Sequence, residues 1–255
     1  MIIPDKTYFL DAAKAVIDNF ESGYYHPKMY LKNPKGYAIM KTSGETMYGL
    51  DRHAGHDIYY KTPRKTKSVQ DNLKYIESGD YEYKTKAAKN FWSLIDSLDA
   101  KNNWPHYYLG GANRDKLTLL ASEIMYNEFL KLAYKNLNEA AQKIVFADPR
   151  LLFHFIYATW NGPDFFKFYA NKLKKSIQEA KNVNTLVDEQ IELRKNSKYK
   201  QIRDTGEKMK QLFKNAKFVS TVKNVSKNPF TWIIILGLAG LGFYLYNQKQ
   251  INATV

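Results

Sequence analysis

The sequence contains no cysteine among its 255 residues. This absence excludes a disulfide framework, a zinc-thiolate site and a thiol nucleophile. Three common enzyme motifs are also missing: the Gly-x-Ser-x-Gly elbow of serine hydrolases, the Walker phosphate loop and the His-Glu-x-x-His of zinc proteases. Any catalytic chemistry must therefore come from other side chains, and carboxylic acids are the first to consider.

The sequence from Met1 to Asp5 lacks the basic stretch and apolar stretch of a secretory signal, so we expect no export signal. The formal net charge of +14 is unevenly distributed. Between Lys195 and Lys227 there are ten Lys or Arg residues against two acids, Asp204 and Glu207. A basic segment of this kind favours a lipid surface over a specific nucleic-acid interface, which would spread over a folded face.

One long apolar run follows the basic segment. Phe230 to Tyr246 contains no charged residue, with Trp232 near one end and two tyrosines near the other. These features predict a single membrane helix, and the preceding lysines predict that the N-terminal part stays on the cytoplasmic side. We therefore expect a catalytic domain at 1–181, a basic helical stalk or linker at 182–228, a transmembrane helix at 229–247 and a short tail at 248–255.

Helical periodicity dominates the sequence as far as Lys181. Lys6 to Phe20 has an apolar stripe, with Asp5 as a candidate N-cap and Gly23 as a candidate stop. Similar patterns predict helices at 85–100, 115–134, 150–160 and 164–181, with one more ending near Phe146. The intervening Tyr37 to Leu50 predicts a small β lobe. Met40-Lys41-Thr42 and Thr46-Met47-Tyr48 flank Ser43-Gly44-Glu45, which indicates either a small hairpin or an irregular two- or three-stranded lobe. The fold class we expect is mainly α with a small β lobe, an α+β lysozyme-like arrangement.

Glu21 lies at the C-terminal end of the first predicted helix. The negative pole of the helix and the apolar cover of Phe20, Tyr24 and Tyr25 would both raise the pKa of its carboxyl. A carboxylic acid that stays protonated near neutral pH can serve as the general acid in glycosidic bond cleavage. On these physical grounds alone, an ordinary solvated glutamate at a helix end is the simpler interpretation.

Two sequence motifs favour a catalytic role for Glu21 over a solvated surface position. Glu21-Ser22-Gly23-Tyr24 resembles the Glu-x-Gly-Tyr that closes the first helix in lysozyme-like muramidases of glycoside hydrolase family 108, which include phage endolysins. Gly44-Glu45-Thr46-Met47-Tyr48-Gly49-Leu50 resembles the second motif of that family, Gly-Gly-x-Thr-x-x-Gly-Ile, although Ser43 replaces its first glycine and the spacing is longer. The resemblance extends from Met1 to about Tyr60. It implies that Glu21 is the general acid and that Thr46 lies opposite, where it orients a water.

Other residues are candidates for supporting roles. The segment from Phe155 to Tyr169 resembles the late buried helix of muramidases and lytic transglycosylases, which implies that Tyr157 contacts a sugar ring and Asn161 an acetamido group. The alternative is a core helix that ends at a proline. Tyr24 and Tyr48 are further candidates for substrate binding. Glu45 and Asp51 are possible second carboxylates, with surface hairpin positions as the alternative. His53, His56 and Asp57 make too weak a set to predict a metal site, and no cofactor is expected.

The leading hypothesis is a glycosidase that cleaves the β-1,4 MurNAc–GlcNAc bond of peptidoglycan, either with water as a muramidase or by internal attack as a lytic transglycosylase. The alternative is a non-enzymatic, membrane-anchored viral structural protein with a lysozyme-like body. The expected partners are peptidoglycan strands, a lipid bilayer and other virion proteins. An enzyme without an export signal whose substrate lies outside the cell suggests a bacteriophage with a membrane inside its virion, or an endolysin held at the host membrane.

Overall fold

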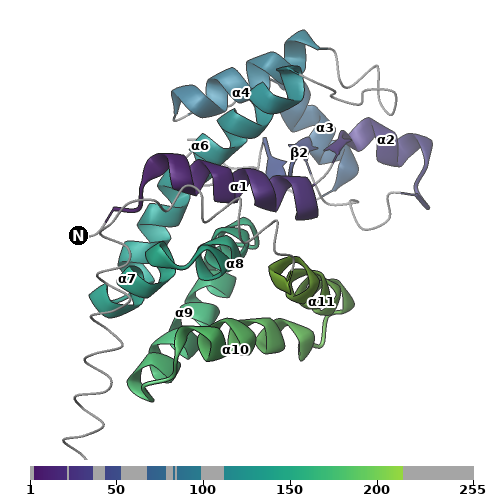
Figure 1. Ribbon diagram of the computed structural model, residues 1–255. Helices are drawn as coiled ribbons and strands as arrows, with labels where there is room; N and C mark the ends of the chain where they lie inside the picture. The colour runs from purple at the N-terminus through teal and green to yellow at the C-terminus, as the bar shows by residue number, and fades with distance from the viewer. Residues whose placement is uncertain are drawn as a thin grey trace, which may run out of the picture. The chain divides into compact units, whose positions relative to one another are not determined.

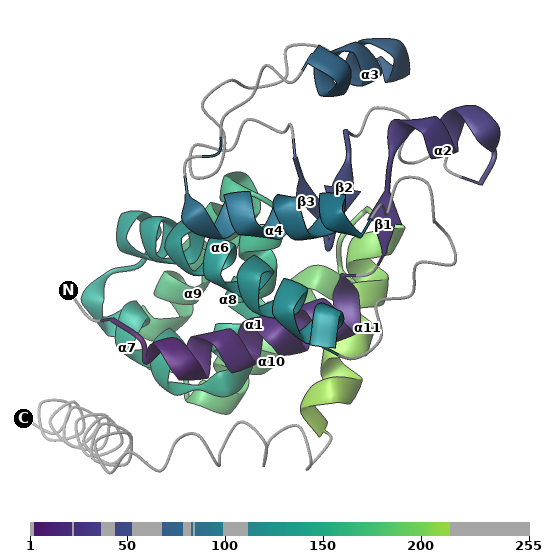
Figure 2. The ribbon, with the colours of Figure 1, turned by 90° about the horizontal axis from the view of Figure 1, so that it is seen from above.

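The computed structural model describes residues 3–21, 23–36, 44–52, 68–78, 83, 85–98 and 112–214. The described chain forms two compact units. Unit 1 consists of residues 3–12, Ala133–Phe155 and 163–214, and unit 2 consists of Ala13–Leu132 and Ile156–Gly162. Both are mainly helical, and a three-stranded sheet belongs to unit 2 (Figures 1 and 2). This confirms the mainly α fold class with a small β lobe.

The first helix, α1 (Lys6–Phe20), begins and ends where the sequence predicts. The Asp5 carboxylate accepts a hydrogen bond from the Tyr8 backbone N–H at 2.8 Å, which satisfies a donor that the helix leaves unpaired. After the helix, Gly23 adopts a φ of 81°, a left-handed conformation that glycine reaches without steric cost. The buried stripe of α1 comprises Phe9, Ala13, Val16 and Ile17.

The sheet of unit 2 contains three short strands in antiparallel order, β1 (Tyr24–Tyr25), β2 (Thr46–Met47) and β3 (Leu50–Asp51). The turn between β2 and β3 is formed by Tyr48 and Gly49, whose φ angles are 51° and 72°. The described residues therefore form the three-stranded alternative of the predicted lobe, and its β2–β3 turn lies at Tyr48-Gly49. The predicted strand at residues 40–42 lies outside the described residues.

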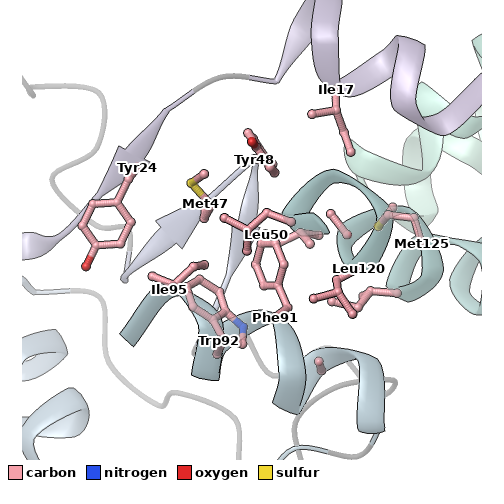
Figure 3. Packing of buried hydrophobic residues seen from close by; sticks show 14 of the residues in the cluster. Ile17, Tyr24, Met47, Tyr48, Leu50, Phe91, Trp92, Ile95, Leu120 and Met125 are labelled. Carbon is pink, nitrogen blue, oxygen red and sulfur yellow. The ribbon is translucent and has the colours of Figure 1, made fainter. Parts of the chain in front are cut away.

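One face of this sheet packs on the core of unit 2. Tyr24, Met47 and Leu50 share that face because they are register partners or neighbours across the ladder. They pack with Phe91, Trp92 and Ile95 of α4 (Lys86–Ser97), and Leu120 and Met125 of α6 (Ala112–Asn136) complete the cluster (Figure 3). Thr46, Tyr25 and Asp51 occupy the opposite face of the ladder.

Two helices of unit 2 have no counterpart in the sequence prediction, α2 (Pro27–Lys32) and α3 (Val69–Ser78), and they contact each other. The α2 helix is very short and relies on its cap: His26 Nδ1 accepts from the Lys28 N–H at 3.2 Å, and Pro27 fixes the first turn. A segment this short shows no helical period, which explains why the sequence did not reveal it.

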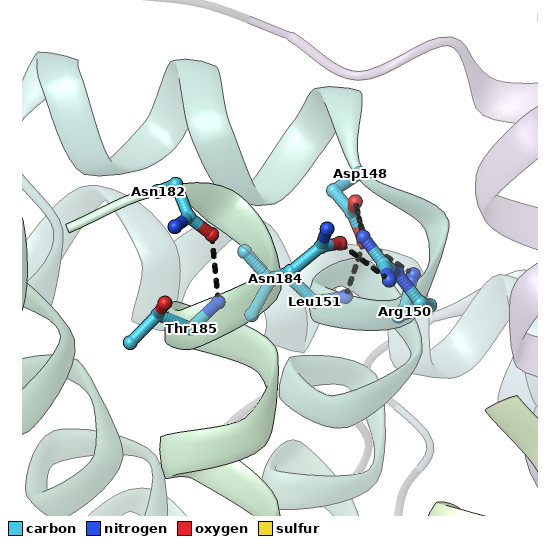
Figure 4. A network of polar contacts seen from close by, with 6 residues as sticks. All are labelled: Asp148, Arg150, Leu151, Asn182, Asn184 and Thr185. Carbon is cyan, nitrogen blue, oxygen red and sulfur yellow. Dashed lines mark hydrogen bonds and ion pairs between the residues drawn. The ribbon is translucent and has the colours of Figure 1, made fainter.

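Unit 1 contains α7 (Glu139–Ala147), α9 (Pro163–Gln178), α10 (Val183–Lys195), α11 (Lys200–Lys214) and the first part of α8 (Pro149–Trp160). The Asp148 carboxylate caps α8 by accepting from the backbone N–H groups of Arg150 and Leu151, and it also binds the Arg150 guanidinium at 2.7 Å (Figure 4). Arg150 Nη1 in turn donates to Asn184 Oδ1 at 3.0 Å, which ties the start of α8 to α10.

The segment predicted as a stalk or linker from residue 182 is helical, but its first part is packed within unit 1. Leu186, Val187 and Ile191 of α10 are buried, as is Met209 of α11. A Cβ on Gly206 of α11 would meet Arg194 and Lys195 of α10 at 3.0 Å or less, so this glycine permits the close contact of the two helices. The described residues after Lys181 therefore belong to the same compact unit as α9.

No helix within the described residues is long and apolar enough to cross a bilayer. The predicted membrane segment at 229–247 and the tail at 248–255 lie outside the described residues, as does the stalk beyond Lys214. The loop residues His53, His56 and Asp57 also lie outside them.

Candidate functional site

Glu21 follows the last residue of α1, and its carboxyl group lies against the β2–β3 turn of unit 2. The backbone N–H of Glu21 donates to the Ile17 carbonyl at 3.1 Å, which continues the helical geometry and fixes where the side chain leaves the chain. A Cβ atom placed on Gly49 would lie 2.5 Å from Glu21 Oε2 and 3.1 Å from its carboxyl carbon. Glycine at position 49 is therefore what makes room for this carboxyl.

Trp160 forms another wall beside Gly49. Its indole Cδ1 would lie 3.1 Å from the same Cβ position, and its Nε1–H donates to the Tyr48 carbonyl at 2.8 Å. The ring is half-buried and packs against the core of unit 2. Because the indole binds the turn through Tyr48, it holds the strained Tyr48–Gly49 backbone in the position where it meets Glu21.

Burial changes the acidity of Glu21. Removal of the carboxyl from water raises its pKa from 4.5 to about 8, because a charged carboxylate loses more hydration than the neutral acid. The part of the chain that the structure describes supplies no cation to this carboxyl, so nothing there offsets the loss. Glu21 is consequently a neutral acid at pH 7 that still keeps part of its surface accessible.

Thr46 and Asp51 are register partners on the face of the sheet opposite Met47 and Leu50. The Thr46 hydroxyl donates to the Gly44 carbonyl at 3.2 Å, which leaves its oxygen lone pairs available as acceptors. One oxygen of Asp51 accepts from the Gly44 N–H at 3.0 Å. Both side chains are half-buried, so this pair is a polar patch next to the turn that contacts Glu21.

Glu45 is not a surface residue, in contrast to one of the two interpretations open from sequence. It is 3% exposed and lies 3.3 Å from Arg52 Nε, and its other oxygen accepts from the Tyr24 hydroxyl at 2.6 Å. Arg52 also binds Asp96 at 2.6 Å and stacks over the Trp92 ring at 4.5 Å. This arrangement occupies the Glu45 carboxylate in joining the sheet to α4, so its surroundings suit a structural role.

The predicted substrate-binding residues occupy different environments. Tyr24, Tyr48 and Tyr157 are 3%, 5% and 8% exposed, and their placement suits support of the site rather than contact with a sugar. Tyr157 packs on Phe20, which precedes Glu21, with ring centroids 4.7 Å apart. Asn161 is exposed, and its amide donates to the Tyr157 carbonyl at 2.8 Å at the end of α8.

Sequence reasoning did not select Gly49 and Trp160 as site residues, yet both border the Glu21 carboxyl. For Gly49, the available signal was its place in the Tyr48-Gly49 step of the second motif. Trp160 lies in the Phe155 to Tyr169 segment that resembles the late helix of muramidases, but only Tyr157 and Asn161 of that segment were selected as site residues.

Comparisons with known proteins identify no relative. No protein-family model, no curated protein and no solved structure matches this chain.

Proposed function

We propose that this protein is a glycosidase that cleaves the β-1,4 MurNAc–GlcNAc bond of peptidoglycan, with Glu21 as the general acid. The observation that carries the proposal is the environment of Glu21, a desolvated carboxyl with a pKa raised to about 8 beside a turn that admits no side chain. A glycosidase of this type must deliver a proton to the leaving oxygen at a pH where a free carboxylic acid has lost it. The resemblance of the two motifs to family 108 muramidases supports the same role.

The second step of the reaction needs a nucleophile. Thr46 has acceptor lone pairs on the face of the sheet that it shares with the Asp51 carboxylate, and together they are suited to hold a water molecule. Attack by that water would make the protein a muramidase. Attack by the 6-hydroxyl of the muramic acid itself would make it a lytic transglycosylase, with a 1,6-anhydro product. Both routes use one proton donor, and Glu21 is the donor in either case.

The test is product analysis on purified peptidoglycan with the full-length chain. Cleavage should release fragments whose mass identifies the route, because an anhydro product is lighter than the hydrolysis product by one water. Glu21→Gln keeps the size and hydrogen-bonding capacity of the side chain but has no proton to give. We expect it to lower turnover by a factor of about 10² to 10⁴ without unfolding the protein.

A matched control is available in the same unit. Asp18→Asn changes a nearby carboxylate of α1 that is paired with Arg114 at 2.8 Å, and it should leave turnover close to that of the wild type. Wild-type turnover in a folded Glu21→Gln protein would remove the proposed mechanism. Absence of cleavage by the wild-type chain would instead favour a structural protein of the virion.

We further propose that the enzyme is anchored to a bilayer by the apolar run from Phe230 to Tyr246. The support is compositional: an uncharged run that is preceded by a segment with ten Lys or Arg between Lys195 and Lys227. A phage enzyme made inside the host and delivered with a membrane-containing virion would reach peptidoglycan when the virion meets the cell wall. Deletion of residues 228–255 should release the protein from the membrane fraction and leave glycan cleavage intact.

A further inference from the structure

Two large aromatic side chains of unit 1 are exposed close to one cavity. Phe168 of α9 is 46% exposed, and Tyr199, between α10 and α11, is 56% exposed. Both line a cavity of about 510 Å³, together with Asp164, Phe165, Tyr169, Leu193, Asn196, Ser197, Lys198 and Ile202. We call this surface the aromatic face. A grouped set of exposed apolar side chains is characteristic of a surface that contacts another molecule.

The aromatic face also carries positive charge. Lys198 Nζ lies 5.0 Å from the centroid of the Tyr199 ring, and Lys172 Nζ lies 5.9 Å from that of Phe168. The cavity lining also includes one carboxylate, Asp164. An acidic partner would therefore face this negative charge as well as the positive charges of the lysines. Aromatic rings beside lysines are the side chains that proteins place at the boundary between lipid headgroups and acyl chains, where the ring is half-solvated and the ammonium group meets phosphate.

We propose that the aromatic face docks on a bilayer surface that contains anionic phospholipid. The sequence that follows the aromatic face favours a bilayer as its partner. The chain from Lys195 to Lys227 carries ten basic and two acidic residues, and the uncharged run begins at Phe230, shortly after α11 ends at Lys214. Even fully extended, this connection spans at most about 60 Å, so an inserted run would hold unit 1 close to the membrane. The proposal concerns unit 1; it rests on the proposed membrane anchor but not on the activity of Glu21.

The absence of cysteine allows a direct test. Asn196→Cys introduces a single thiol at an exposed position on the cavity lining, and an environment-sensitive fluorophore attached there reports on the face itself. The labelled full-length chain is reconstituted in vesicles of phosphatidylcholine with phosphatidylglycerol, and in vesicles of phosphatidylcholine alone. We expect blue-shifted emission and quenching by headgroup-labelled lipids in the anionic vesicles, and weaker signals in the neutral vesicles or at high salt.

Substitutions in the aromatic face then test which side chains contact the vesicle. Phe168→Ser combined with Tyr199→Ser should abolish the anionic-vesicle signal, because the rings that enter the interface are gone. Lys172→Gln and Lys198→Gln should each weaken the docked state by about fivefold, the usual contribution of a lysine near an anionic surface. Leu119→Ser is the matched control, since Leu119 is an equally exposed apolar side chain, at 49%, on α6 in unit 2.

Two results would overturn the proposal. The first is a fluorophore signal that is the same in both lipids and unchanged by the serine variants. The second is a signal that responds to soluble N-acetylglucosamine oligosaccharides but not to vesicles, which would make the face a carbohydrate site. Glycan cleavage is measured separately, so failure of lipid docking and failure of the proposed activity can be told apart.

Discussion

Glu21 and Glu45 are two glutamates of unit 2 whose carboxyl groups are withdrawn from water in different ways. Glu45 lies 3.3 Å from Arg52 Nε and accepts from the Tyr24 hydroxyl, so its charge is compensated inside the protein. Glu21 lies against Gly49, and the described residues give it no ionic partner. Burial with a cation stabilises the carboxylate, whereas burial without one stabilises the neutral acid. Only the second arrangement provides a proton donor near neutral pH.

The largest loss of stability should come from removing the cation of the buried Glu45–Arg52 pair. Arg52→Met leaves the Glu45 carboxylate buried without its cation, and we expect a loss of about 3–5 kcal/mol in the free energy of unfolding. Denaturant titration measures it. Adding Glu45→Gln to Arg52→Met should restore part of the loss, because it removes the uncompensated charge.

A surface pair provides the control for that experiment. Lys143 and Glu139 form an exposed ion pair in α7 at 3.0 Å, and Lys143→Met should cost far less stability than Arg52→Met, because solvent screens exposed charges. Equal losses for Arg52→Met and Lys143→Met would show that the buried pair contributes no more than an exposed one, and the contrast between Glu45 and Glu21 would lose its basis.

Glu21 should behave in the opposite way to the Glu45–Arg52 pair, because removing its charge should stabilise the protein at high pH. Because the folded-state pKa of Glu21 is raised to about 8, its contribution to stability is complete below about pH 4.5 and is lost as the pH rises through 8. Glu21→Gln removes this dependence. Above pH 8 the variant should therefore be more stable than the wild type, by on the order of 2 kcal/mol once partial exposure of the carboxyl is taken into account.

Thermal melts of both proteins from pH 4 to pH 9 test this prediction. The melting temperature of the wild type should fall relative to that of Glu21→Gln across the interval. Parallel curves would mean that the Glu21 carboxyl is ionised in the folded protein and is not desolvated. In the wild type, the rate of glycan cleavage should decline above about pH 8, as the acid loses its proton.

The sequence predicted the first helix and singled out Glu21 as a candidate acid, because both inferences depend on local information. The apolar stripe of α1, its Asp5 cap and the Glu-x-Gly-Tyr motif all lie between Asp5 and Tyr24. The neighbours of Glu21 depend on long-range contacts. Trp160 reaches the turn from the end of α8, and no periodicity reports that contact.

The burial of Glu45 against Arg52 could not be predicted from the sequence either. Its position in a short polar run suggested either a catalytic or a surface residue, and it is buried because Arg52 lies across the two-stranded ladder from it. The backbone N–H of Arg52 donates to the Glu45 carbonyl at 2.8 Å, so the pairing depends on a hairpin register.

A smaller perturbation tests the contact between Glu21 and the turn. In Gly49→Ala the new Cβ would lie 2.5 Å from Glu21 Oε2, so the carboxyl must move. The residue also keeps a φ of 72°, which costs an alanine about 1–2 kcal/mol. We expect turnover to fall by roughly ten- to a hundredfold, the effect of displacing a catalytic group by about 1 Å.

Gly162→Ala separates the effect of backbone strain from the effect of displacing the Glu21 carboxyl. Gly162 has a φ of 100°, and a Cβ there would meet nothing within 4 Å, so this variant has backbone strain without a collision. It should lose stability to a similar extent while turnover remains near that of the wild type. Equal turnover losses in the two alanine variants would indicate that general destabilisation, and not movement of Glu21, lowers the rate.

The smallest effect concerns the hydrogen bond that holds the turn. Trp160→Phe keeps an aromatic ring beside Gly49 but removes the Nε1–H that donates to the Tyr48 carbonyl, and the loss should be about 1 kcal/mol in unfolding free energy. Ser122→Ala removes another side chain–backbone hydrogen bond of unit 2, at 2.8 Å within α6, and leaves the turn untouched. The two variants should differ in turnover, because only Trp160→Phe releases the turn against which Glu21 is held. A severalfold drop in cleavage rate for Trp160→Phe, with Ser122→Ala unchanged, is the expected result. If both variants cleave glycan at the wild-type rate, the turn keeps its place without the indole, and Gly49 alone defines the surroundings of the acid.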